Sequence, residues 1–488
     1  MKRFISLLLI VAIMIVPMVG CNSGDEESSE AMSTVEKGNE YLDENGKYKP
    51  LHTIVDQEGK EFNIIVRGES FGTYQSEDFT TESELYGDLL NDAVAERNNV
   101  VEELYGVTLN VYKSDTINND VYNDCFSGIG AYDAVMPSLS YLATLAAENF
   151  LYDLTTIENF DLDAPWWNKN CTDAYSIENR VYFTTGDITI LSMVNTPSIL
   201  FNKEMIGTYG LDNPYDLVKN KEWTFDKMVE MCKAVSDIKT ADGSYSDDNI
   251  YGLLTSYSDP ANFLWGSGEL VTKKDGDDIP YVSLNNERAI TIAQKILEEF
   301  ANADYLIFAE ECPDPIWVTS LEIFAEGRCL FRPSAFSATT KLRKQSEIEF
   351  GILPKPLMDE SQTDYVSYCG GSETAGIGIP TSAPDKEYSA YMIEAYAAQA
   401  KNYITHAYYD INLRTKDARD DESEEMLDII FGSLVYDIGA LYDVGGIVAM
   451  FRTLTQNGSA DIASQFESKI PVAEAELEEI VLAFMDGE

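Results

Sequence analysis

Apolar and polar residues alternate with two different periods along the first half of the chain. Residues 62–66 have the apolar pattern of a buried strand, and apolar residues recur on one helical face over residues 85–105. Strand patterns return at residues 107–111 and 132–136, and a helical pattern covers residues 142–150. Strands that alternate with helices in this way predict an α/β domain with a largely parallel sheet.

The second half of the chain continues this mixture and then becomes almost entirely helical. Helices are predicted over residues 223–235 and 286–300, and short strands over residues 329–332 and 350–353. From residue 385 onward nearly all apolar spacings are helical. The chain has 488 residues, which is enough for two or three domain-sized cores.

The N-terminus has the pattern of an export signal. Lys2 and Arg3 precede an apolar run over residues 4–16, which is too short to span a bilayer. The following Met-Val-Gly-Cys, which ends at Cys21, resembles the bacterial lipobox, whose cysteine is lipidated and becomes the new N-terminus. The alternatives are an ordinary cleaved signal with an incidental cysteine, or an uncleaved anchor.

These features predict a signal peptide over residues 1–20 and a flexible acidic tether over residues 21–50, which are rich in Ser, Glu, Asp, Asn and Gly. A lipid on Cys21 would attach the protein to the outer face of the cell membrane. We therefore expect an extracytoplasmic, lipid-anchored protein.

Charge and cysteine content narrow the functional classes. The 84 acidic and 34 basic side chains leave a net charge of −50, which disfavours binding to nucleic acid and to anionic lipid surfaces. The six cysteines after Cys21 form no CxxC pair, so we expect most of them to be buried free thiols. One or two disulfides among them are the alternative. Only two histidines are present, and the HExxH, P-loop and GxGxxG motifs are absent. We therefore expect no metal, no cofactor and no enzymatic activity.

Three stretches, taken in order, are similar to one family. They are RVYFTTGDITILSMVNTPSILFNKEMIGTYGL (residues 180–211), followed by KEWTFDKMVEMC (221–232); FAEGRCLFRPSAFSATTKL (324–342); and the segment from FGILPKPLMDE to EYSAYMIEAYA (350–397). Together they resemble the extracellular solute-binding proteins of ABC-type sugar importers, in the family 1 cluster that contains maltose-binding protein. The resemblance covers most of the chain after the signal sequence.

This resemblance implies a two-lobed periplasmic-binding-protein-like fold of type II. Each lobe would be a mostly parallel sheet flanked by helices, and a hinge with flexible glycines near Gly186 and Gly370 would join them. It implies a first lobe over residues 51–188 plus 371–415 and a second lobe over residues 189–370 plus 416–488. It also implies a monomer that captures a mono- or oligosaccharide between the lobes and delivers it to the transmembrane subunits of an ABC permease.

Candidate ligand-binding residues follow from the chemistry of sugars. Sugars present hydroxyls for hydrogen bonding and apolar C–H faces for aromatic rings, so a sugar site combines aromatic side chains with carboxylates and other polar groups. Position relative to the predicted strands and hinges selects Tyr74, Trp166, Trp167, Asp187 and Glu373, and the resemblance adds Trp265, Ser334 and Phe336. Ser334 stands where the resemblance leads us to expect a stacking tryptophan, which argues against linear maltodextrins.

Two other classes of function remain open from the sequence. A binding protein of the same architecture would serve equally for a peptide, an amino acid, a polyamine or another polyol, and an acidic cleft would favour cations. A surface glycosidase or peptidase is the second alternative, because any two of the many acidic residues could form a pair of catalytic carboxylates.

Overall fold

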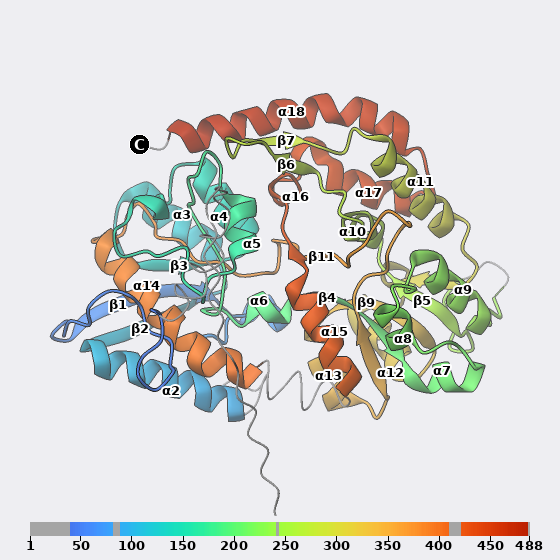
Figure 1. Ribbon diagram of the computed structural model, residues 1–488, viewed down its shortest axis with the longest axis horizontal. Coiled ribbons are helices and arrows are strands. Elements are labelled where there is room, and N and C mark those ends of the chain that lie inside the picture. Colours follow the sequence, from blue (N-terminus) through green and yellow to red (C-terminus); the bar gives the residue numbers. More distant parts are fainter. Residues whose placement is uncertain (1–39, 82–87, 241–243, 409–420, 487–488) are drawn as a thin grey trace, which may run out of the picture.

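The structure is a computed structural model that describes residues 40–81, 88–240, 244–408 and 421–486. Two lobes lie side by side, and several segments of the chain run between them (Figure 1). The predicted signal peptide, Cys21 and the greater part of the predicted tether lie outside the described residues.

Lobe one is built on a parallel three-stranded sheet with the order β2-β1-β3. β1 (Lys60–Arg67) pairs with β2 (Val107–Ser114) along its whole length and with β3 (Ala134–Met136) through Ile64–Val66. The strands bury Phe62, Ile64 and Val66 on one face and Ile65 on the other, because successive side chains point to opposite faces and helices cover both.

Helices of lobe one come from both ends of the chain. α14 (Lys386–Ala400) packs against α2 (Asp88–Tyr105), and nearly all of its residues are buried. An antiparallel bridge from Val135 to Gly378 joins the returning chain to β3. The other helices of this lobe are α3 (Ile117–Ser127), α4 (Leu139–Ala147) and α5 (Lys169–Tyr175).

Lobe two contains a five-stranded sheet with the order β10-β4-β9-β5-β8. Its strands are β4 (Pro197–Asn202), β5 (Tyr251–Thr255), β8 (Leu306–Phe308), β9 (Cys329–Ala335) and β10 (Phe350–Leu353). The pairs of β5 with β8 and β9 are parallel, whereas the pairs of β4 with β9 and β10 are antiparallel. This sheet is therefore mixed, whereas the family resemblance implies a mostly parallel sheet in each lobe.

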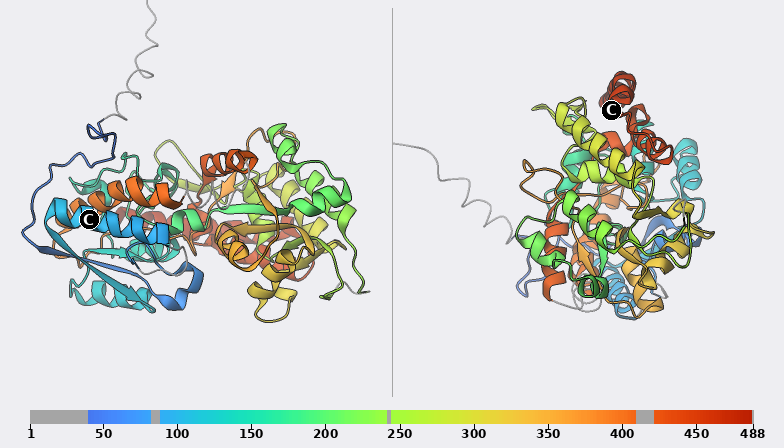
Figure 2. Two further views of the ribbon diagram at one scale, coloured as in Figure 1. Left: turned by 90° about the horizontal axis from the view of Figure 1, so that it is seen from below. Right: turned by 90° about the vertical axis from the view of Figure 1, so that its right-hand side faces the viewer.

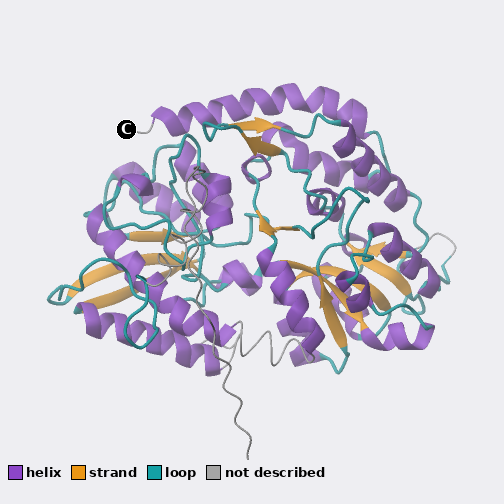
Figure 3. Cartoon of the chain, in the orientation of Figure 1, coloured by secondary structure: helices purple, strands orange, loops and turns teal. Residues whose placement is uncertain are grey.

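Helices cover both faces of the lobe-two sheet (Figure 3). α9 and α11 are amphipathic, and α11 buries Ala289, Ile296 and Phe300 in the core of lobe two, where it packs against α10, α17 and α18. The helices of this lobe are α7 (Lys203–Tyr209), α8 (Pro214–Lys219), α9 (Phe225–Val235), α10 (Asp259–Gly266), α11 (Glu287–Ala301), α12 (Ile316–Ala325), α13 (Ser337–Gln345) and α15 (Asp421–Gly432).

The lobes are joined by more than the hinge segments. The first crossing passes through α6 (Leu191–Val194), and the return passes β11 (Ser367–Tyr368), which pairs with β12 (Leu434–Val435). α18 (Ile462–Asp486) lies across one side of both lobes, and the ring of Phe484 contacts Tyr182 of lobe one with centroids 4.9 Å apart (Figures 1 and 2). The remaining elements near α18 are the hairpin β6 (Thr272–Lys274) and β7 (Pro280–Val282), with α16 (Ile438–Leu441) and α17 (Ile447–Gln456).

Gly186 lies where the first crossing leaves lobe one. An added Cβ there would be only 2.1 Å from the Trp166 carbonyl oxygen, so the close approach of these two segments requires glycine. The backbone bridge between Trp167 and Gly186 depends on the same approach.

Two sequence expectations about the periphery have clear outcomes. Residues 40–50 do not behave as a tether: Tyr41 is buried and its hydroxyl donates a 2.7 Å hydrogen bond to Asp161 of lobe one. The six described cysteines are all free thiols, five of them buried, as expected.

Among the described residues, no helix has the length and apolar content needed to cross a membrane.

Candidate functional site

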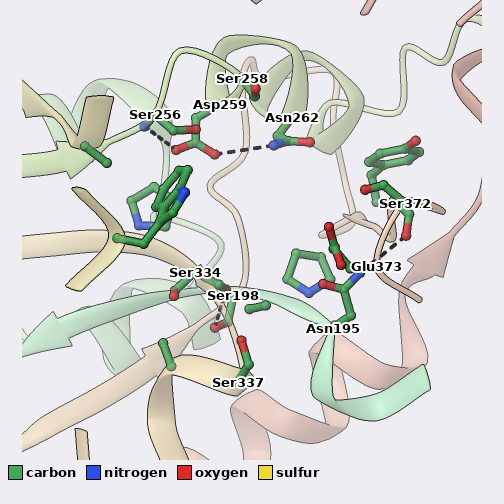
Figure 4. Close-up of a pocket in the computed structure, with 18 of the residues that line it drawn as sticks. Asn195, Ser198, Ser256, Ser258, Asp259, Asn262, Ser334, Ser337, Ser372 and Glu373 are labelled. Atoms are coloured by element: carbon green, nitrogen blue, oxygen red, sulfur yellow. Dashed lines mark hydrogen bonds between the residues drawn. The ribbon is translucent and has the colours of Figure 1, made fainter. Parts of the chain in front are cut away.

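A cavity of about 760 Å³ lies between the lobes, and both of them line it (Figure 4). Lobe one contributes the 3₁₀ helix after β1 and the start of α4, and lobe two contributes the ends of β4, β5 and β9 together with α10, α12 and α13. The polar lining residues include Ser140, Asn195, Ser198, Ser256, Asp259, Asn262, Ser334, Ser337, Ser372 and Glu373.

The edge of the lobe-two sheet supplies a fixed carboxylate. β5 ends at Thr255 and α10 begins at Asp259, so Asp259 closes the turn at the carboxyl end of the strand. Its carboxylate accepts hydrogen bonds from the Thr255 hydroxyl at 2.8 Å, from the Ser256 amide at 2.9 Å and from the Asn262 amide at 3.3 Å. Its position at the N-terminal end of a helix also favours the negative charge. These three hydrogen bonds hold the Asp259 carboxylate in a fixed position at the cavity wall (Figure 4).

A buried guanidinium lies on the neighbouring strand. Arg332 of β9 is 7% exposed, and its Nη1 donates to the Ser334 hydroxyl at 2.6 Å. Its Nη2 donates a longer bond of 3.4 Å to Ser320, and its Nε has no partner in the described part of the chain. Burial lowers the pKa of Arg332, and the negative charge of Asp259 opposes that shift.

Lobe one reaches the cavity through its own strand end. The 3₁₀ helix Glu69–Tyr74 follows β1, and the Tyr74 hydroxyl lies 3.5 Å from the Ser337 hydroxyl of lobe two. Burial raises the pKa of Tyr74, so its phenol is protonated at neutral pH. Arg67, the last residue of β1, donates a 2.6 Å bond to the carbonyl of Glu373, which positions the returning segment beside the cavity.

Two tryptophan side chains line the cavity, one of them buried and the other exposed. Trp265 of α10 is only 3% exposed, its ring lies 4.5 Å from that of Tyr368, and its indole nitrogen has no hydrogen-bond partner among the described residues. Trp317, in the first turn of α12, is 56% exposed and also lines the cavity. An exposed indole beside polar groups has the apolar face and the freedom to stack on a small molecule.

Four of the sequence-predicted residues lie on the cavity wall: Tyr74, Trp265, Ser334 and Glu373. They come from lobe one, lobe two and the returning crossing, and the fold brings them together although they span 299 positions of the sequence. That they contact a ligand stays a prediction.

The tryptophan pair is placed elsewhere. Trp166 and Trp167 are 1% and 6% exposed in the core of lobe one, and neither lines the cavity. Their indole nitrogens donate hydrogen bonds of 2.9 and 2.8 Å to the buried Glu394 of α14, whose Oε1 also accepts from the Asp161 amide. The pair therefore stabilises lobe one, and we withdraw the prediction that it stacks on a ligand.

Asp187 and Phe336 are also outside the cavity lining. The Asp187 carboxylate pairs with Lys401 at 3.0 Å and accepts a hydrogen bond from Thr405, so its oxygens serve the hinge rather than a ligand. Phe336 is fully buried against Phe431. Both are structural residues of the segments that flank the cavity.

Sequence reasoning missed several residues of the wall, above all Asn195, Asp259, Trp317, Arg332 and Lys355. Trp317 and Lys355 lie in ordinary helical and loop patterns that carry no signal of their own. Only Asp259 had a local signal, because an acidic residue followed by proline after a buried strand is typical of a helix start.

Solved structures with a similar arrangement are known. The ABC substrate-binding protein Lmo0181 from Listeria monocytogenes, solved with cycloalternan, superposes with a TM-score of 0.53 at 13% sequence identity, over 86% of this chain and 99% of that one. This chain has the two-lobed fold of ABC solute-binding proteins. The GacH receptor of Streptomyces glaucescens, solved unliganded and with acarbose, shares this fold with a TM-score of 0.52 and 12% identity over 88% of this chain and all of that one.

A third solute-binding protein of this fold is from Thermotoga lettingae and was solved with α-D-tagatose. It has a TM-score of 0.52 and 16% identity over 87% of this chain and all of that one. Neither a protein-family model nor a curated protein matches the sequence. The likeness to solute-binding proteins is therefore one of fold.

Proposed function

We propose that the protein is a substrate-binding protein that captures a carbohydrate in the interlobe cavity and delivers it to an ABC permease, without catalysis. The observation that carries this proposal is the cavity itself. Its volume of about 760 Å³ falls within the range of small-molecule sites, and its wall combines hydroxyl, amide and carboxylate groups with aromatic faces. The sugars bound to the three similar structures support the same class of ligand.

The charge of the wall argues against one alternative. The cavity lining contains three basic and two acidic side chains among the described residues. A polyamine would need a predominantly acidic wall, because each ammonium must find an anionic or hydrogen-bonding partner when it leaves water. Isothermal titration calorimetry against a panel of neutral and acidic glycans, polyamines and amino acids tests the proposal, and it fails if no glycan binds.

We expect Trp317→Ala to weaken binding of any glycan identified in that panel by about tenfold or more. An exposed indole that stacks on a sugar contributes about 1–3 kcal/mol through its apolar area and ring contacts. Calorimetric titration of the variant measures the loss. Tyr281→Ala removes an aromatic ring that is 49% exposed on β7 and does not line the cavity, and it is expected to bind as the wild type does. Equal affinities in the Trp317 variant and the wild type would remove this residue from the site.

We further propose that Cys21 carries a lipid that anchors the chain to the outer face of the membrane. The support is the N-terminal pattern of two basic residues, an apolar run and a small residue before cysteine. In a bacterial host grown with labelled palmitate, the full chain is expected to incorporate label and to sediment with membranes, and Cys21→Ser to lose both. Unlabelled wild-type protein in the medium would contradict the anchor and leave the binding function intact.

A further inference from the structure

The charge of the cavity wall is opposite in sign to that of the whole chain. The sequence has 84 acidic and 34 basic residues, yet the described cavity lining has Arg332, Lys341 and Lys355 against only Asp259 and Glu373. All three basic residues belong to lobe two: Arg332 on β9, Lys341 on α13 and Lys355 two residues after β10. A local excess of cations in so acidic a protein indicates a specific electrostatic requirement inside the cavity.

Lys355 is the most unusual of the three. It is 4% exposed, and its ammonium makes no hydrogen bond or ion pair within the part of the chain that the structure describes. Its Nζ lies 5.1 Å from the centre of the Phe263 ring, and its side chain passes over Gly266, where an added Cβ would come within 3.2 Å of Cδ. Its Nζ is not among the fully enclosed polar atoms of the described residues and therefore keeps access to the cavity, where it has no anionic partner. Withdrawing a lysine this far from water without such a partner is costly.

Arg332 also forms no ion pair with a described residue. It is 7% exposed and donates only to the neutral hydroxyls of Ser334 and Ser320. Lys341 stands at the rim on α13, where burial lowers the pKa of its ammonium and the charge of Arg332 lowers it further. The two cations therefore repel each other, and neither forms an ion pair with a described residue.

The carboxylate of Asp259 does not form an ion pair with any of these three cations. The negative charge of Asp259 raises the pKa values of Arg332 and Lys355 against the effect of burial, so it acts on both electrostatically. Its oxygens, however, are engaged by Thr255, Ser256 and Asn262, and no ion pair of 4.0 Å or less joins it to either cation. The other carboxylate of the wall, that of Glu373, forms an ion pair with Arg67 of lobe one, with Nη1 and Oε2 4.0 Å apart.

We propose that the ligand is an anionic carbohydrate, one that bears a carboxylate or a sulfate, and that Arg332 and Lys355, with Lys341 at the rim, bind its charged group. This inference rests on the proposed function and names the substrate class within it. A guanidinium presents a planar donor pair to an oxyanion, and an ammonium adds a point charge, so the set suits such a group. The hydroxyl and amide groups on the rest of the wall would bind the sugar hydroxyls.

Calorimetric titration of the whole protein with matched sugars tests the inference. One arm compares galacturonate oligomers with their methyl esters, which have the same ring and no charge; the other compares galactose 6-sulfate with galactose. We expect the charged member of one arm to bind at least about tenfold more tightly, because a charge-assisted bond is roughly twice as strong as a neutral one. The arm that responds identifies the anion. Neutral sugars that bind as well as or better than their charged counterparts overturn the inference but not the carbohydrate function. No binding in either arm also overturns the inference, and the carbohydrate function is then decided by the wider glycan panel.

Lys355→Met separates a ligand contact from a structural role. The variant keeps an unbranched side chain as far as Cε and removes a charge that has no ion-pair partner among the described residues, so we expect a melting temperature at or above that of the wild type without ligand. The same variant should lose about tenfold or more in affinity for the charged sugar. Lys295→Met removes a surface ammonium from α11 that pairs with Asp226 at 2.8 Å, and it should change neither quantity appreciably. A Lys355→Met protein that melts far below the wild type, or that binds the charged sugar unchanged, would overturn the inference.

Discussion

Glu394→Ala is expected to lower the free energy of unfolding by about 3–5 kcal/mol, the largest loss we predict in lobe one. The Glu394 carboxyl group is 1% exposed and accepts hydrogen bonds from the indoles of Trp166 and Trp167 and from the Asp161 amide. Truncation leaves two buried indole donors and the partly buried Asp161 amide without an acceptor, and each buried donor costs about 1–3 kcal/mol. Chemical denaturation followed by tryptophan fluorescence measures the loss. Glu387→Ala, on the same helix but partly exposed, should change stability by no more than about 1 kcal/mol.

The same residue gives stability a pH dependence with a defined sign. Burial raises the pKa of Glu394 from 4.5 to about 8, so the folded state favours the protonated carboxyl group. A carboxyl group whose folded pKa is raised contributes stability that is complete below its unfolded pKa and is lost as the pH rises toward the folded value. Relative to Glu394→Gln, which does not titrate, the wild type should therefore lose stability between about pH 5 and pH 8. A difference between the two proteins that is constant over this window would contradict the raised pKa.

Regular elements with one buried face could be predicted from the sequence. The apolar stripe over residues 286–300 corresponds to α11, because Ala289, Ile296 and Phe300 all meet the core of lobe two. The strand predicted over residues 350–353 has the bounds of β10. Local periodicity suffices in such cases because burial of one surface determines both the pattern and the element.

Some residues of the candidate site could be predicted from their place in the chain, whereas others depend on contacts that only the folded structure shows. Tyr74 and Glu373 could be predicted because they follow strand ends or crossings, where chain direction alone brings them to the interlobe space. Trp166 and Trp167 could not, because a paired indole serves a core as well as a ligand, and their partner Glu394 lies more than 220 positions away. Lys355 resembles an ordinary loop lysine in sequence, and its burial depends on packing against α10 that no local pattern shows.

The second large effect is expected for Asp437→Ala, at about 3–5 kcal/mol of unfolding free energy. Asp437 is 2% exposed, and its carboxylate accepts hydrogen bonds from the amides of Val271, Thr272, Gly439 and Ala440 and, at 2.6 Å, from the Thr272 hydroxyl. It thus holds the start of α16 against the β6–β7 hairpin, and removing it leaves buried donors of both elements unpaired. Thermal and chemical denaturation measure the effect.

This variant also links the C-terminal helices to the cavity. Ala440 of α16 lines the cavity, and α16 contacts α4 of lobe one, so loss of the Asp437 bonds should loosen the wall as well as the fold. Asp385→Ala is the matched control: it removes the N-cap of α14, a carboxylate that is 51% exposed and accepts from the Tyr388 amide, and should cost about 1 kcal/mol. We expect the Asp437 variant to weaken binding of the cognate sugar at temperatures where it is still folded, and the Asp385 variant to bind normally. If Asp437→Ala were no less stable than Asp385→Ala, the buried carboxylate would not be the link between these elements that its five donors indicate.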